Sequence, residues 1–143
     1  MRNLLLFCII LPAFLALDLT WIGVVMQGFY NSELGDLARR EAGALAPRWS
    51  AAIPVYLLIP AGIVLFVGPR IGPQAGILAA FGWGAVFGLI LYGVYDLTNM
   101  SVLDKWTWRM TLADIVWGTV LCGTTSVILR AADRWLGAHE SWR

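Results

Sequence analysis

Three aspartates stand inside or at the edge of long apolar segments, and they are the side chains of this sequence best suited to chemistry. Asp18 lies deep in the first apolar segment, Asp96 follows the third, and Asp114 lies near the start of the fourth. A carboxylate near the centre of a bilayer costs roughly 2.5–3.5 kcal/mol on insertion scales. Such groups are therefore expected to face the protein interior, where they can bind a cation, hold a polar headgroup or exchange protons.

Each aspartate is followed three residues later by a side chain that can donate a hydrogen bond. The pairs are Asp18 with Trp21, Asp96 with Asn99, and Asp114 with Trp117. Residues three apart lie on nearly one face of a helix, and indole and amide N–H groups donate to carboxylates. We therefore expect each carboxylate to receive a hydrogen bond from its own helix.

The sequence offers few residues for other kinds of catalytic centre. It contains one histidine, His139, and two cysteines, Cys8 and Cys122, which lie far apart in apolar segments. Haem, di-iron and catalytic zinc sites normally need several histidine or thiolate ligands. We therefore expect no metal and no cofactor, and we assign no catalytic residue.

The composition places these aspartates in a membrane protein. Of 143 residues, 59% are hydrophobic and 13% are charged, against about 25% charged residues in a soluble domain. The net charge of +1 provides no basic surface for nucleic acid. Membrane lipid is the expected partner, and nucleic acid is not.

Four apolar segments have the length of a membrane-spanning helix, which is about 17–25 residues. They cover residues 4–26, 51–67, 75–95 and 112–129. We predict an all-α fold in which residues 1–143 form a single integral membrane bundle of four transmembrane helices. The first segment continues to Met26, so it is expected to be a span and not a cleaved signal peptide. Leu34, Leu37 and Ala38 repeat at helical spacing after it, which predicts a short amphipathic interfacial helix.

The direction of the four spans brings the aspartates together. The first and third spans run the same way and the fourth returns, so Asp18, Asp96 and Asp114 are predicted in one half of the membrane. We expect the polar segment 97–111 to fold over that half as a lid, with Lys105 and Arg109 near the acids. The predicted pocket comprises Asp18, Trp21, Tyr30, Tyr92, Asp96, Thr98, Asn99, Arg109, Asp114 and Trp117.

Small residues recur every four positions in the third span, at Gly76, Ala80, Gly84 and Gly88. Such a row allows another helix to approach closely. The row fits two roles: packing against another helix of the same chain, or an interface between two copies of the chain.

The basic residues do not determine how the protein is oriented in the membrane. With an even number of spans, one side carries Arg2, Arg70, Arg130, Arg134 and Arg143, and the other carries Arg39, Arg40, Arg48, Lys105 and Arg109. With five basic residues on each side, the positive-inside rule does not favour either orientation. Arg2 flanks the first span, so we expect both termini on the cytoplasmic side.

Several short motifs resemble a family of small predicted bacterial membrane proteins known only as a domain of unknown function. They are Asp18-Leu19-Thr20-Trp21-Ile22-Gly23, Phe29-Tyr30, Leu34-Gly35, Tyr56, Gly62-Ile63, Phe66-Val67, Gly84-Ala85-Val86-Phe87-Gly88, Tyr92-Gly93-Val94-Tyr95-Asp96-Leu97-Thr98-Asn99, Trp106 and Asp114-Ile115-Val116-Trp117-Gly118-Thr119. The resemblance covers roughly residues 1–130, and Tyr95-Asp96-Leu97-Thr98-Asn99 is its most specific part. It implies a multi-pass protein of the bacterial inner membrane and supplies no activity.

Three functions fit these observations. We favour binding or transport of a small polar molecule, an ion or a lipid headgroup by the carboxylate-lined pocket. Four spans enclose a narrow interior, so transport would require a homodimer. The alternative is a non-catalytic accessory subunit that packs into a larger membrane complex through the glycine row. A membrane enzyme that uses an aspartate as general acid or base is the third and least favoured reading.

Overall fold

The computed structural model describes residues 1–42, 44–72 and 74–140. Within these residues, four helical segments are long and apolar enough to cross a membrane: Arg2–Val25, Trp49–Arg70, Ile77–Val102 and Trp108–Ala138. The predicted all-α, four-span architecture is confirmed. The spans extend beyond the apolar segments themselves, because the third helix continues to Val102 and the last begins at Trp108.

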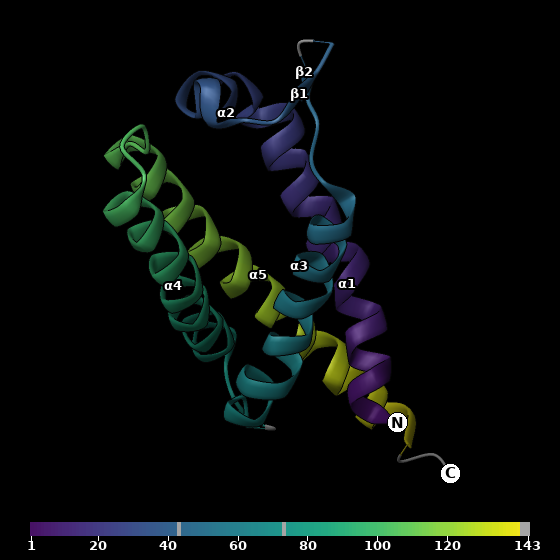
Figure 1. The fold of residues 1–143 in the computed structure, drawn as a ribbon. Coiled ribbons are helices and arrows are strands. Elements are labelled where there is room, and N and C mark those ends of the chain that lie inside the picture. The colour runs from purple at the N-terminus through teal and green to yellow at the C-terminus, as the bar shows by residue number, and fades with distance from the viewer. Residues whose placement is uncertain (43, 73, 141–143) are drawn as a thin grey trace.

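The elements follow one another with short connections (Figure 1). Helix α1 (Arg2–Thr20) continues through a π-helical turn (Trp21–Val25) into α2 (Gln27–Leu34) and a 3-10 turn (Gly35–Leu37). Two short strands, β1 (Arg40–Glu41) and β2 (Ala44–Leu45), pair antiparallel with Arg40 opposite Leu45. Helix α3 (Trp49–Gly62) is extended by a π-helical turn (Ile63–Val67) and a 3-10 turn (Gly68–Arg70), and α4 (Ile77–Val102) and α5 (Trp108–Glu140) complete the fold.

The helix after the first span ends earlier than its apolar spacing predicts. Helix α2 stops at Leu34, and Leu37 and Ala38 lie in the 3-10 turn and the extended segment that follow. Gly35 has a φ of +44°, a backbone angle that residues with a Cβ rarely adopt. This glycine turns the chain out of the helix toward the strand pair.

Helices α4 and α5 pack closely side by side (Figure 1). A Cβ added at Gly84 would collide with Ser126, and one at Gly88 would collide with the Gly118 carbonyl. Ala80 is fully buried, whereas Gly76 lies in open space just before the helix. Three of the four residues in the small-residue row therefore face α5 of the same chain, and Gly76 does not.

The apolar core lies toward the end of the bundle that holds the N-terminus. Its buried members are Leu6, Ile10, Ile63, Val64, Val67, Cys122, Leu129 and Ala132. At this end Arg2 Nε donates to Asp133 Oδ1 at 2.7 Å and joins α1 to α5. Toward α2 the α1–α3 pair and the α4–α5 pair spread apart (Figure 1). Arg143, which the charge count places on the same side of the membrane as Arg2, lies outside the described residues.

Candidate functional site

Asp18 lies at the contact between the first and last spans. Its side chain is only 4% exposed, and its Oδ1 accepts a hydrogen bond of 2.8 Å from Trp117 Nε1 of α5. The Tyr56 hydroxyl of α3 faces the same carboxylate. Three spans therefore contribute to one buried carboxylate and its donors.

A second set of contacts runs from the first span to Asp114. Trp21 Nε1 donates to the Tyr30 hydroxyl at 3.2 Å, and that hydroxyl donates to Asp114 Oδ1 at 2.5 Å. Trp21 and Trp117 stack with ring centroids 4.2 Å apart and 5° between their planes. The stacked indoles connect the two sets of hydrogen bonds, so Asp18 and Asp114 belong to one network of aromatic side chains.

These contacts correct the expectation that each aspartate is served by its own helix. Trp117 donates across to Asp18, and Asp114 instead receives its hydrogen bond from Tyr30. Trp21 donates to Tyr30 and not to Asp18. Residues three apart share a face of a helix, but when that face meets another helix the side chains reach partners across the contact.

The environment of Tyr30 keeps its hydroxyl protonated, so that it can donate a hydrogen bond. Burial raises the pKa of the Tyr30 hydroxyl above its usual range, and the hydrogen bond to the Asp114 carboxylate raises this pKa further. The phenol therefore keeps its proton at neutral pH and remains the donor to Asp114.

An open cavity of about 480 Å³ lies beside these groups, and five helices line it. Its polar wall consists of Asp18, Tyr30, Arg48, Tyr56, Tyr92, Asp114 and Trp117. The remaining lining is apolar: Ile22, Leu34, Leu45, Ala51, Ala52, Val55 and Ile59. A mainly apolar cavity with a few converging polar groups is typical of ligand sites. Five residues of the predicted pocket, namely Asp18, Tyr30, Tyr92, Asp114 and Trp117, lie on its wall.

Asp96 is placed apart from this cavity wall. It is fully buried, and within the described part of the chain neither carboxylate oxygen has a hydrogen-bond partner. The expected donation from Asn99 is therefore absent. Thr98 is exposed, and its backbone carbonyl accepts a hydrogen bond from Ser101. Neither Thr98 nor Asn99 lines the cavity.

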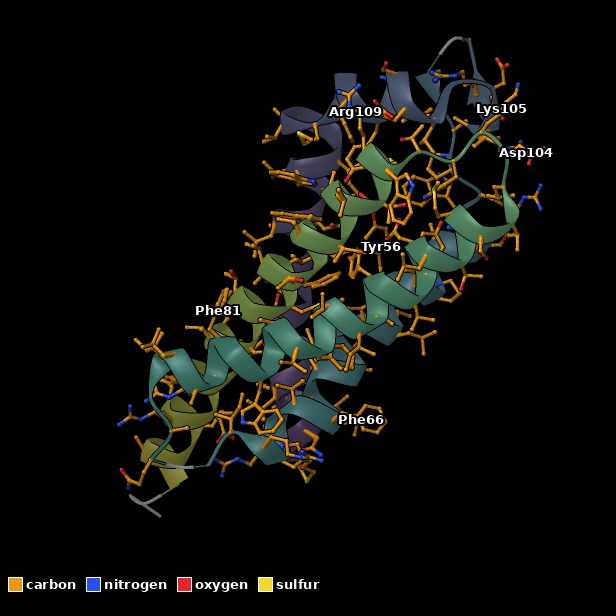
Figure 2. All side chains as sticks on the ribbon, turned by 90° about the vertical axis from the view of Figure 1, so that its left-hand side faces the viewer. Tyr56, Phe66, Phe81, Asp104, Lys105 and Arg109 are labelled. Carbon is orange, nitrogen blue, oxygen red and sulfur yellow. The ribbon has the colours of Figure 1, made fainter. Side chains whose placement is uncertain are left out.

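The expected lid does not bring cations to the aspartates. Because α4 continues to Val102, the connection to α5 is short, and Lys105 pairs with Asp36 at 2.9 Å. Arg109 pairs with Glu33 at 3.0 Å, and the Glu33 side chain is only 8% exposed. Figure 2 shows Lys105, Asp104 and Arg109 at one end of the molecule, with Tyr56 further toward its middle. Lys105 and Arg109 therefore pair with Asp36 and Glu33, which follow the first span, and not with the aspartates of the spans.

The pocket prediction missed Tyr56, Arg48 and the role of Glu33. Tyr56 is the one tyrosine of the proline-containing second span, and Arg48 immediately precedes α3. A polar aromatic residue in an apolar span is a usable signal, since its hydroxyl needs a partner. Within the described residues, no group of three or more His, Cys, Asp or Glu side chains is placed to hold a metal ion.

Comparison with known proteins identifies the family. A family model described as "Predicted membrane protein (DUF2177)" matches residues 3–130. No curated protein and no solved structure matches the chain. The match covers most of the chain, including every residue that lines the cavity, and the chain therefore belongs to this family of predicted membrane proteins.

Proposed function

We propose that this protein binds a small polar molecule, an ion or a lipid headgroup in the open cavity, and that the bound group is cationic. The observation that carries the proposal is the presence of two carboxylates, Asp18 and Asp114, on the wall of one cavity within a membrane bundle. Intramembrane carboxylates mark sites for substrates, ions or protons in many membrane proteins.

The donors around these two carboxylates support a cationic ligand. Asp18 accepts hydrogen bonds from Trp117 and Tyr56, and Asp114 accepts one from Tyr30. All of these donors are neutral at neutral pH, and neither carboxylate forms an ion pair with a described lysine or arginine. Hydrogen bonds from neutral groups orient a carboxylate without cancelling its charge. The cavity wall carries two carboxylates against the one guanidinium of Arg48, so the site remains complementary to a positive group.

The accessory-subunit alternative has less support. It depended on the small-residue row of the third span as a surface for a partner helix. Ala80, Gly84 and Gly88 pack against α5 of the same chain, so that row offers a partner little room. A homodimer or a larger complex would need another surface. The enzyme alternative gains no nucleophile–base pair from these contacts.

The binding test uses purified protein in a nonionic detergent and two simple cations, ethylammonium and tetramethylammonium. A ligand that binds only the folded state stabilises it by about 2.7 kcal/mol at a hundred times its dissociation constant. We expect one of these cations to raise the unfolding temperature saturably, beyond the effect of sodium chloride at equal ionic strength. The double variant Asp18→Asn, Asp114→Asn should lose this response.

The matched control is Asp104→Asn, which removes an exposed carboxylate from the loop between α4 and α5. This variant should keep the full response. An equal response in the double variant, or none in the unmodified protein, contradicts the proposal.

We further propose that the protein lies in the bacterial inner membrane with both termini in the cytoplasm. The N-terminal end of α1 and the C-terminal half of α5 meet at one end of the bundle through Arg2 and Asp133, which supports a common side. Terminal fusions to a reporter that is active only in the cytoplasm should be active at both ends. Activity of a periplasm-specific reporter at either end would contradict this orientation.

A further inference from the structure

An apolar groove between α3 and α4 adjoins the polar cavity. This groove of about 380 Å³ is lined by Val55, Leu58 and Ile59 of α3 and by Leu91, Tyr92 and Tyr95 of α4. Val55, Ile59 and Tyr92 line both the groove and the cavity. The two spaces therefore adjoin one another at these three residues.

The groove faces the hydrocarbon of the bilayer. Both of its walls belong to spanning helices, and within the chain Leu58 is 69% exposed and Tyr95 is 58% exposed. The groove is therefore open to a molecule already dissolved in the membrane, and it adjoins the cavity that holds Asp18 and Asp114. A soluble cation needs no such opening.

We infer that the ligand is a single-chain amphiphile with an amine head, whose ammonium group lies near Asp18 and Asp114 and whose chain lies in the α3–α4 groove. This inference rests on the proposed function and adds the chemical class and the route of entry. Charge complementarity places the ammonium group at the carboxylates, and the apolar lining beyond Tyr92 suits a hydrocarbon chain. The volumes of the two spaces suit a small head and one chain.

Entry from the groove does not require that the hydrocarbon chain supply a large share of the affinity. A hydrocarbon chain gains little on moving from lipid into an apolar groove, because the lipid is equally apolar. The bilayer instead concentrates the amphiphile beside the groove, and the carboxylates select its head. Blocking the groove should therefore impair binding of a long amine while leaving a short amine unaffected.

The test is photolabelling in lipid nanodiscs with an octylammonium probe that carries a diazirine at the end of its chain. We expect the label to concentrate on peptides from α3 and α4 at the groove and to fall when excess unlabelled octylammonium is added. Leu91 lines the groove but not the cavity. Leu91→Trp fills the groove, and it should reduce this labelling about tenfold, the effect of a typical overpacking penalty. Leu58→Trp, on the opposite wall, should act in the same way.

The matched control is Leu89→Trp, at a half-exposed position of α4 that does not line the groove. This variant should label like the unmodified protein, and all three variants should keep the ethylammonium response in thermal unfolding, which also shows that they fold. Labelling spread evenly over lipid-facing residues, or unaffected by both groove variants, overturns the inference. If the unmodified protein responds to ethylammonium or tetramethylammonium in that case, the proposed function stands alone; if it responds to neither cation, both proposals fail.

Discussion

Asp96 differs from Asp18 and Asp114, the other two aspartates of the long apolar helices, in having no hydrogen-bond partner among the described residues. Asp18 and Asp114 each receive a hydrogen bond from an aromatic side chain of another helix, whereas both Asp96 oxygens are buried without one. A buried polar group without a partner costs about 1–3 kcal/mol. Proteins retain such a group against stability chiefly where function needs it.

We therefore predict that Asp96→Leu stabilises the protein. Leucine has the same branched arrangement of four non-hydrogen side-chain atoms and removes the unsatisfied carboxyl group, so the free energy of unfolding should rise by about 1–3 kcal/mol. Thermal unfolding in detergent measures this change. Thr98→Leu, two residues away at an exposed position, serves as the control and should change stability little. Destabilisation by Asp96→Leu would show that the carboxyl group has a stabilising partner in the membrane.

At the scale of the element, the α4–α5 contact depends on glycine at particular positions. Gly88 meets the Gly118 carbonyl so closely that a Cβ has no space. Gly93 lies five residues further along the same helix and has nothing within reach of an added Cβ. The two glycines therefore separate the effect of helix packing from that of helix propensity.

Alanine should have opposite effects at these two glycines. Gly88→Ala forces α4 and α5 apart and should cost about 1–3 kcal/mol, the range for overpacking. Gly93→Ala should stabilise by roughly 0.5–1 kcal/mol, because alanine restricts the unfolded chain and favours the helix. Thermal unfolding of both variants under the same conditions tests the pair. Equal effects of either sign would mean that α4 and α5 do not pack as described.

At the scale of the whole molecule, two ion pairs connect the helices at the end of the bundle opposite to the termini. Lys105, in the loop between α4 and α5, pairs with Asp36 beyond α2, and Arg109 at the start of α5 pairs with Glu33. Thr107 Oγ1 also donates to Glu33 at 2.6 Å. These contacts join the α4–α5 pair to α2 across the end at which the helix pairs spread apart.

The pH dependence of this connection follows from Asp36. The hydrogen bond and the charge of Lys105 lower the pKa of Asp36 below its ordinary value of 3.8. Because this pKa is lower in the folded state, the contribution of the pair is present above pH 3.8 and is lost as the pH falls through the lowered pKa. We expect amide hydrogen exchange in residues 103–107 to be faster for Asp36→Asn than for the unmodified protein at pH 7. Glu41→Gln, an exposed acid that pairs with Arg39 instead, should leave that exchange unchanged.

The spans follow from the sequence because each is a local property. An apolar segment of sufficient length must form a helix in lipid to satisfy its own backbone, whatever its neighbours do. The residues of segments 4–26, 51–67, 75–95 and 112–129 therefore indicated four crossings. Their polar ends were harder to predict, since α4 runs through Asp96 and Asn99 to Val102 although hydrophobicity falls after Tyr95.

Only the tertiary structure decided which partners the aspartates have. The sequence places Trp117 three residues after Asp114, but the packing of α1 against α5 directs its indole to Asp18, and Tyr30 serves Asp114. Lys105 and Arg109 have the charge to pair with these acids, yet Asp36 and Glu33 lie closer. Spacing along a helix determines which residues share a face, whereas the rotation and approach of neighbouring helices determine what that face meets, and those depend on packing along the whole chain.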